Sequence, residues 1–256
     1  MTARRRSSIL AVAGLPVLAA AACGGDAEDP TARRTVTVFA AASLTESFEQ
    51  IGRDFPAAHP GTTVRFNFGA SSALAQQIVQ GAPADVFAAA SPTLMQQVVD
   101  ANLVTARPAT FVRNRLQIAV PRGNPGGVRG LADFATDELK IALCAPQVPC
   151  GAAAGKAFAA AGVVARPDTL EQDVKATLSK VRLGEVDAAL VYRTDVLAAG
   201  GEVEGLDVPE ATQAVNDYPV AVLARAADAG DARTFVDHLL SERGRAVLAG
   251  AGFDRP

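Results

Sequence analysis

The chain has 256 residues, of which 49% are hydrophobic and 5% aromatic, and a formal net charge of −3. This length is enough to bury the core of one large domain or of two small ones. No basic stripe with interleaved aromatic residues occurs along the sequence, which argues against a protein that binds nucleic acid.

The first 22 residues differ in composition from the rest. Three arginines at positions 4–6 precede an apolar run over residues 9–22, which ends in small residues before Cys23. This is the layout of a secretory signal peptide, and the run is too short to favour a membrane-spanning helix. Residues 20–23, with the sequence AAAC, resemble a bacterial lipobox, in which the cysteine becomes the lipidated first residue. An ordinary signal peptide with a chance cysteine is the alternative.

We therefore predict a lipoprotein signal peptide over residues 1–22 and a flexible tether over residues 23–34. The mature protein would be exported and lipid-anchored to the outer face of the cytoplasmic membrane, and the export route stays open. Removal of the signal peptide takes away three arginines and no acidic residue, which leaves a formal charge of −6. A negative chain attracts anions poorly over long range, so an anion site in it would have to rely on local dipoles.

Besides Cys23 at the processing site, the chain has two cysteines, Cys144 and Cys150, six positions apart. Outside the cytoplasm such a pair favours a disulfide, with two free buried thiols as the alternative. A loop this short would gain about 2 kcal/mol from the cross-link. Two cysteines with no histidine or further cysteine near them fall short of a metal site.

Strand-like apolar runs alternate with helical patterns along the rest of the chain. Strands are predicted over residues 35–41, 63–68, 85–89, 116–120, 139–144, 188–192 and 218–223. Helices are predicted over 44–55, 74–80, 92–100, 151–162, 173–183, 194–199 and 231–249. This alternation predicts the α/β class, with mainly parallel sheets flanked by helices. Two lobes suit the chain better than one. Residues 35–114 with 219–256 would form the first lobe, and residues 115–218 the second.

Junctions between strands and helices are the candidate binding positions, because helix starts offer unpaired N–H groups and a partial positive charge. Ser43 follows the first strand and has capping-box spacing to Glu46, so capping its helix is the simpler explanation. Ser71 stands at the second junction after small residues. Cys150 follows Pro149 at the third junction.

The remaining two junctions are less specific. Asp173 is a plausible helix cap directly before Val174, and Tyr192 ends a strand. A buried tyrosine often packs in the core with one hydrogen bond. Taken singly, each of the five junctions is better explained as structural than as functional.

Three segments carry a family resemblance. Residues 38–45 (VFAAASLT), residues 81–87 (GAPADVF) and the pair Val191-Tyr192 resemble the periplasmic molybdate-binding proteins of ABC importers. The resemblance extends from about residue 35 to about residue 253. It implies a two-lobed periplasmic-binding-protein fold of the second type, in which one oxyanion lies between the lobes and is held by neutral donors.

The matching motif positions imply a set of binding residues. Ser43 and Ser71 would supply hydroxyl and backbone N–H groups, Cys150 and Val174 would supply backbone N–H groups, and Tyr192 would supply its phenol. Molybdenum would be held as molybdate through these residues, with no direct protein ligand to the metal and no cofactor. The family often has alanine where this chain has Cys150, so a disulfide to Cys144 would add a clamp on the binding loop.

The same resemblance implies partners: molybdate or tungstate as ligand, and the membrane permease of an ABC importer. We expect a monomer that binds no nucleic acid.

A same-fold protein for another anion, such as sulfate or an organic acid, is the alternative. Organic-acid binders usually need an arginine, and none lies in the first four junctions, although Arg193 follows Tyr192. An enzyme is not expected: there is no Gly-x-Ser-x-Gly motif, and His59 and His238 are predicted at the surface.

Overall fold

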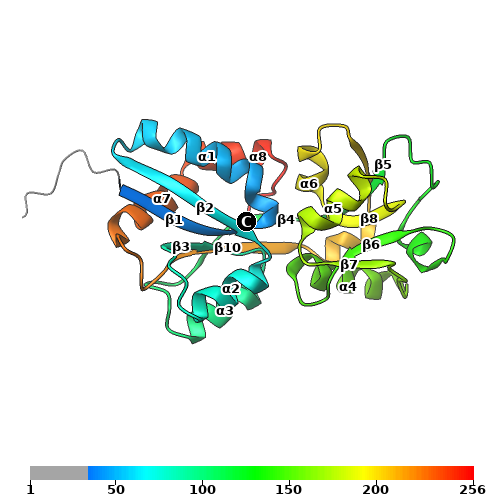
Figure 1. Cartoon of the computed structure of the whole chain (residues 1–256), viewed down its shortest axis with the longest axis horizontal. Coiled ribbons are helices and arrows are strands. Elements are labelled where there is room, and N and C mark those ends of the chain that lie inside the picture. Colours follow the sequence, from blue (N-terminus) through cyan, green and yellow to red (C-terminus); the bar gives the residue numbers. More distant parts are fainter. Residues whose placement is uncertain (1–33) are drawn as a thin grey trace, which may run out of the picture. The chain divides into compact units, whose positions relative to one another are not determined.

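The computed structural model describes residues 34–256. The predictions for the signal peptide, for lipidation at Cys23 and for the tether up to residue 33 lie outside the described residues. Two five-stranded sheets, each flanked by helices, form two lobes (Figure 1). This confirms the predicted fold class. Within the described part of the chain, no helix is long and apolar enough to span a membrane.

The first lobe has the strand order β2-β1-β3-β10-β4. β1 pairs in parallel with β2 and β3, whereas β10 runs antiparallel to β3 and β4, so the sheet is mixed. The strands are β1 (Arg34–Ala41), β2 (Thr62–Gly69), β3 (Val86–Ala88), β4 (Ala109–Asn114) and β10 (Asn216–Val222). The sequence did not predict β4, whose pattern of buried and exposed residues is irregular.

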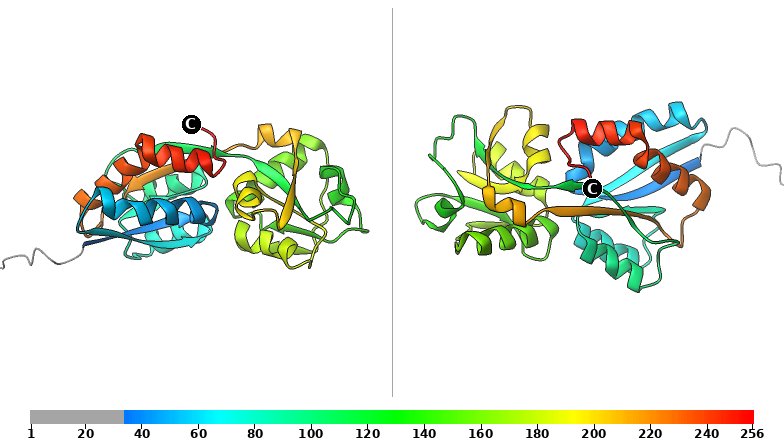
Figure 2. Two further views of the ribbon diagram at one scale, coloured as in Figure 1. Left: turned by 90° about the horizontal axis from the view of Figure 1, so that it is seen from above. Right: turned by 180° about the vertical axis from the view of Figure 1, so that it is seen from behind.

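Helices cover both faces of this sheet (Figures 1 and 2). On one face lie α1 (Thr45–Ala58), α7 (Ala229–Leu240) and α8 (Glu242–Gly250), and on the other α2 (Ser71–Val79) and α3 (Pro92–Asp100). A short 3-10 helix, η1 (Ala42–Leu44), leads into α1. Phe48, Phe55 and Phe235 are buried on the first face, and Leu74 and Met95 on the second.

The prediction of one terminal helix over residues 231–249 is wrong, because Ser241 separates α7 from α8. Ser241 has extended backbone angles, φ −66° and ψ 167°, which a continuous helix does not allow. Its side-chain oxygen accepts a hydrogen bond from the N–H of Gly244 and so caps α8. Local hydrogen bonding by serine outweighs the helical periodicity at this position.

The second lobe has the strand order β7-β6-β8-β5-β9, again with parallel and antiparallel pairs. Its elements are β5 (Leu116–Pro121), β6 (Ile141–Cys144), α4 (Pro149–Ala161), β7 (Thr169–Glu171), α5 (Val174–Arg182), β8 (Ala188–Tyr192), α6 (Arg193–Ala198) and β9 (Val203–Asp207), with the 3-10 helices η2 (Leu131–Ala135) and η3 (Pro209–Gln213). The sequence did not predict β7 and β9. Both are edge strands with few buried residues, so they lack the apolar pattern of a central strand.

The chain crosses between the sheets at two neighbouring places. It leaves the first sheet at the end of β4 and enters the second at β5, and it returns from η3 to β10. β10 begins at Asn216, inside the range 115–218 predicted for the second lobe, and Asn216 pairs directly with Asn114 of β4. The lobe bounds themselves stay a prediction.

Candidate ligand-binding site

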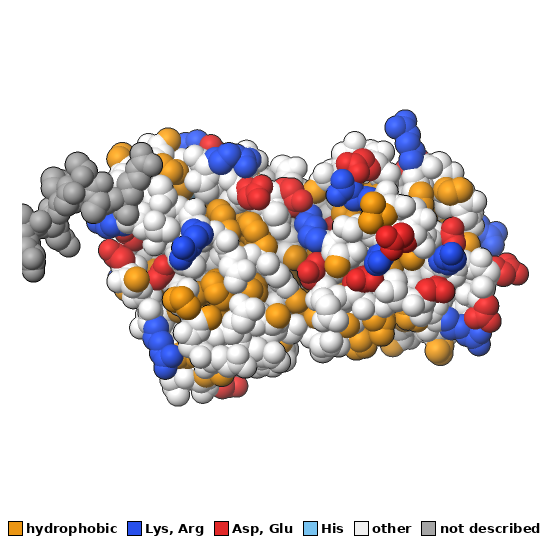
Figure 3. All heavy atoms as spheres, viewed as in Figure 1, with side chains coloured by type: hydrophobic (Ala, Val, Ile, Leu, Met, Phe, Trp, Pro, Cys, Tyr) orange, Lys and Arg blue, Asp and Glu red, His pale blue; other side chains and the backbone are white. Residues whose placement is uncertain are grey.

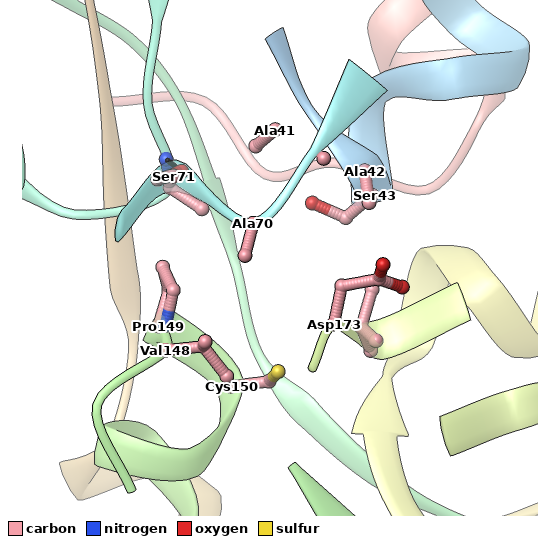
Figure 4. Close-up of a pocket in the computed structure, with 12 residues that line it drawn as sticks. Ala41, Ala42, Ser43, Ala70, Ser71, Val148, Pro149, Cys150 and Asp173 are labelled. Atoms are coloured by element: carbon pink, nitrogen blue, oxygen red, sulfur yellow. Dashed lines mark hydrogen bonds between the residues drawn. The ribbon is translucent and has the colours of Figure 1, made fainter. Parts of the chain in front are cut away.

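A small pocket lies where the carboxyl ends of first-lobe strands face helix starts of the second lobe. Figure 4 shows Ser43, Ala70 and Ser71 on one side of it and Val148, Pro149 and Cys150 on the other. The space open to the centre of a water-sized sphere is about 20 Å³, and one water needs roughly 10–15 Å³ by this measure. The pocket therefore suits a compact ligand. It is lined by Ala41, Ala42, Ser43, Gly69, Ala70, Ser71, Ala90, Val148, Pro149, Cys150, Asp173 and Val174.

Backbone N–H groups surround this pocket. Ser43, Ser71, Cys150 and Val174 all lie in the first turn of a helix. First-turn N–H groups have no acceptor within their own helix, and they carry the positive end of the helix dipole. No side chain caps η1, α2 or α4. These N–H groups are therefore available to an acceptor in the pocket.

The Ser43 side chain does not cap a helix, so the capping explanation for it is wrong. Ser43 lies inside η1, and its Oγ is 2.8 Å from the hydroxyl of Tyr218. Glu46, the expected capping-box partner, instead accepts hydrogen bonds from the Nζ of Lys175 at 2.7 and 2.8 Å. The Ser43 hydroxyl is therefore part of the pocket wall.

The Ser71 hydroxyl has a defined direction. Its Oγ accepts a hydrogen bond from the N–H of Ala90 at 2.9 Å. A hydroxyl has one proton to donate, and the bond from Ala90 does not use it. Ser71 can therefore donate its proton to a ligand in the pocket.

Tyr192 is the one predicted site residue that does not line the pocket. It is 1% exposed, and its hydroxyl accepts a hydrogen bond from the Nδ2 of Asn216 at 3.0 Å. Burial raises the pKa of both Tyr192 and Tyr218. Both phenols therefore keep their protons at neutral pH. The other four predicted residues, Ser43, Ser71, Cys150 and Val174, do line it.

Asp173 is the only charged residue among the described residues that line the pocket. Its Oδ1 accepts a hydrogen bond from the N–H of Ala176 at 2.9 Å, which confirms the predicted helix cap. No cationic side chain contributes to the lining formed by the described residues. A bound anion would thus have to be held by dipoles.

An ion-pair cluster lies beside the site, around Lys175 of α5. Its Nζ is 2.7 Å from a carboxylate oxygen of Glu46 in the first lobe and 3.1 Å from Asp195 in the second. Burial lowers the pKa of Lys175, but the two carboxylates more than offset this and the pKa is raised. Burial raises the pKa of Asp195 to about 6, against the opposing effect of Lys175.

Cys144 and Cys150 are joined by a disulfide, with an S–S distance of 2.05 Å. The bond links the end of β6 to the first turn of α4 and so restrains the segment that carries the Cys150 N–H. Gly151 packs against the same loop so closely that a Cβ there would collide with the carbonyl of Ala145. The loop is therefore held both by the cross-link and by close packing.

Ala90 is a lining residue that the sequence reasoning missed, although a signal for it was present. The sequence VFAAAS occurs twice, at residues 38–43 and 86–91. The two copies pair in parallel and in register, Val38 with Val86 and Phe39 with Phe87. The second copy therefore brings Ala90 to the same edge of the sheet as Ser43.

Tyr218, Asn114 and Asn216 were also missed. They belong to no local motif, and the contacts that connect them to the pocket join residues far apart in the sequence. Their position near the predicted crossovers, at residues 114/115 and 218/219, is the signal that the sequence offers for them.

His238 is buried, so the prediction that both histidines lie at the surface is wrong for this residue. Its ring lies 5.3 Å from those of His59 and Phe55, and burial lowers the pKa of His238. Among residues 34–256, no group of three or more His, Cys, Asp or Glu residues could hold a metal ion.

Acidic and basic side chains are interspersed on the molecular face drawn in Figure 3. Mixed charge of this kind creates little long-range attraction for an anion. Binding in the pocket would therefore depend on its own N–H and O–H groups.

The two lobes and the small pocket of helix-start N–H groups are those of a solute-binding protein with the periplasmic-binding-protein fold. Residues 36–254 match the family model described as bacterial extracellular solute-binding protein, and the chain belongs to that family. It is 40% identical over 250 residues to the molybdate-binding protein ModA of Mycobacterium tuberculosis, which covers 97% of this chain and 96% of that protein.

Two solved structures share the fold. The periplasmic molybdate-binding protein of Azotobacter vinelandii superposes with a TM-score of 0.74 at 20% identity, over 86% of this chain and 99% of that one. The sulfate-binding protein SubI of Mycobacterium tuberculosis gives a TM-score of 0.76 at 18% identity, over 87% of each chain. At these identities the comparison concerns the fold alone.

Proposed function

We propose that this protein is the binding component of an ABC importer and that it captures molybdate or tungstate in the pocket between the lobes. The observation that carries the proposal is the lining itself: helix-start N–H groups and two serine hydroxyls, with no cationic side chain among the described lining residues. The 40% identity to a molybdate-binding protein supports the same ligand.

Neutral donors suit a tetrahedral dianion. Oriented N–H and O–H dipoles in a site closed to water stabilise negative charge without a counter-ion. A ligand that carries a proton would place it against another donor and lose a hydrogen bond, at a cost of about 1–3 kcal/mol. Phosphate, which is partly protonated at neutral pH, should therefore be rejected.

Ser43, Ser71, Cys150 and Val174 are the proposed direct contacts, since all four line the pocket. Tyr192 is proposed as the fifth. Its hydroxyl accepts a hydrogen bond from Asn216, and Asn216 also donates to the carbonyl of Ala90, which lines the pocket. We propose no catalysis for this protein, because its relatives are named as binding proteins and the described residues that line the pocket include no nucleophile paired with a base.

The chain would be exported, lipid-anchored through Cys23 to the outer face of the cytoplasmic membrane, and monomeric. It would deliver its ligand to the membrane permease. The resemblance of residues 20–23 to a lipobox and the family membership support this placement.

Calorimetric titration of the mature protein with molybdate, tungstate, sulfate and phosphate tests the function. We expect one molybdate or tungstate per chain and an affinity for phosphate lower by about 100-fold. Sulfate carries the same charge but is smaller, so its weaker binding would report the size of the cavity. Equal affinity for sulfate, or no heat with molybdate, would overturn the proposal.

A further inference from the structure

Two asparagines face each other where the chain crosses between the lobes. Asn114 ends β4, Asn216 begins β10, and the two are direct cross-strand partners. Asn114 is 1% exposed and Asn216 is half-buried. Each amide makes hydrogen bonds both toward the pocket and toward a residue of the second lobe.

The first chain of hydrogen bonds starts at Asn114. Its Nδ2 donates to the Oγ1 of Thr194 in α6 at 2.8 Å and to the hydroxyl of Tyr218 at 3.4 Å. The Tyr218 hydroxyl in turn lies 2.8 Å from the Oγ of Ser43. All four side chains are buried, so water does not compete for these bonds.

The donor-to-acceptor direction of these hydrogen bonds follows from one backbone contact. The N–H of Arg115 donates to the side chain of Asn114 at 3.0 Å, so the atom it meets is the carbonyl Oδ1. The Nδ2 of Asn114 then faces the hydroxyls. Tyr218 accepts from it, so the phenol proton is free to be donated to Ser43. Because Ser43 accepts that proton, its own proton is left for the pocket.

The second chain starts at Asn216 and has the same direction. Its Nδ2 donates to the carbonyl of Ala90 at 2.7 Å, an atom that only accepts, and to the hydroxyl of Tyr192 at 3.0 Å. The N–H of Ala90 donates to Ser71 at 2.9 Å. Tyr192 accepts from Asn216 and Ser71 accepts from the backbone of Ala90, so each hydroxyl keeps a proton to donate. The backbone N–H fixes the direction at Ser71 without any contribution from Asn216.

We propose that Asn114 and Asn216 are positioning residues: Asn114, through Tyr218, directs the Ser43 proton toward the ligand, and Asn216 donates to Tyr192 and so leaves the phenol proton of Tyr192 for the ligand. Through Tyr218 and Tyr192 they select a fully deprotonated tetrahedral dianion over a protonated anion of equal charge. This inference rests on the proposed oxyanion binding and adds the residues that impose its selectivity.

Replacement of either asparagine by aspartate reverses the direction. A carboxylate only accepts hydrogen bonds, so in Asn114→Asp the Tyr218 hydroxyl donates to residue 114 and accepts from Ser43. Ser43 then turns a lone pair toward the ligand. Hydrogen phosphate can donate its proton to that lone pair, whereas molybdate has no proton to donate. In Asn216→Asp the Tyr192 hydroxyl donates its proton to the carboxylate at position 216. That proton is then no longer available to the ligand.

The experiment compares molybdate with hydrogen phosphate at about pH 8, where both are dianions. An added negative charge repels the two ligands equally, so the ratio of their dissociation constants reports hydrogen-bond direction alone. Calorimetry and competition titrations are made on the wild type, Asn114→Asp and Asn216→Asp. Asn67→Asp is the matched control, because Asn67 lies on β2 and its amide meets only Gln77 among the described side chains.

We expect the preference for molybdate to fall at least tenfold in both variants and to stay unchanged in Asn67→Asp. A preference that stays constant while both affinities fall together would overturn the inference. If Asn114→Asp does not fold, as judged by circular dichroism, the half-buried Asn216→Asp decides. Tyr218→Phe, which removes the donor to Ser43 without a charge, gives a third test and should also lower the preference. A wild type that binds no oxyanion would overturn the proposed function instead.

Discussion

At the scale of single residues, the pocket depends on hydroxyl groups whose protons are directed by their neighbours. Ser71 accepts from the backbone of Ala90, and Ser43 lies against the neutral phenol of Tyr218. Hydrogen bonds to a charged group contribute about 1.5–3 kcal/mol each, roughly twice the value for neutral pairs. Each serine should therefore matter measurably to anion binding.

We expect Ser43→Ala and Ser71→Ala each to weaken molybdate binding by at least about tenfold, because each removes one hydrogen bond to a charged ligand. Calorimetric titration measures the effect. Ser47→Ala is the matched control, since Ser47 of α1 is also buried but donates to the carbonyl of Leu44, at the end of η1. A loss of less than twofold in both pocket variants would show that the serines are not ligands.

At the scale of elements, the segment from β6 to α4 combines a binding residue with a covalent restraint. The disulfide joins Cys144 to Cys150, and the N–H of Cys150 is one of the proposed ligand contacts. Pro149 begins α4 and has no N–H of its own, so the first free donors of the helix come from the residues after it. The position of this turn therefore determines where those donors point.

We expect the double variant Cys144→Ala/Cys150→Ala to lose about 2 kcal/mol in the free energy of unfolding, because the unfolded chain regains the entropy of an open loop. Its molybdate affinity should fall as well, since the Cys150 N–H is less restrained. Urea unfolding and calorimetry measure both effects. The same loss should follow when the wild type is reduced, and reductant should leave the double variant unchanged; a wild type insensitive to reductant would contradict this.

At the scale of the whole molecule, ion pairs and buried polar bonds connect the two lobes. Lys175 joins Glu46 of the first lobe to Asp195 of the second. Asp195 is fully buried, and Lys175 stays protonated between the two carboxylates because its pKa is raised. The raised pKa of Asp195, about 6, shows that burial of the carboxylate outweighs its pairing with Lys175.

This pKa sets a dependence of stability on pH. A carboxyl group with a folded pKa of about 6 and an ordinary value of 3.8 binds its proton more tightly in the folded state. Its contribution to stability is therefore complete below about pH 4 and is lost as the pH rises through about 6, by about 3 kcal/mol in total.

Asp195→Asn lacks this titration. We expect the free energy of unfolding of the wild type, relative to the variant, to fall by about 2 kcal/mol between pH 4 and pH 7, the larger part of the total. Urea unfolding at several pH values measures the difference. A difference that is constant over this range would show that Asp195 is not the titrating group.

Much of the fold could be predicted because its elements are encoded by local spacing. The apolar run predicted as a strand at residues 35–41 lies in β1. Pro92 begins α3, as the preference of proline for the first helical turn predicts. The edge strands β7 and β9 were not predicted, because strands with few buried residues carry no clear apolar pattern. Ser241 broke a helix that periodicity alone predicted as continuous.

The sequence by itself determined which positions stand at helix starts, and the family resemblance selected Ser43, Ser71, Cys150 and Val174 among them. Strand and helix patterns are local, so these positions can be read without a structure. Only the tertiary structure decided which residues form hydrogen bonds with the side chains around the pocket. Ser43 meets Tyr218 across 175 positions, and Asn114 meets Thr194 across 80. The packing of the sheets and the crossovers between the lobes create those contacts, and they determine the direction in which each hydroxyl donates its proton.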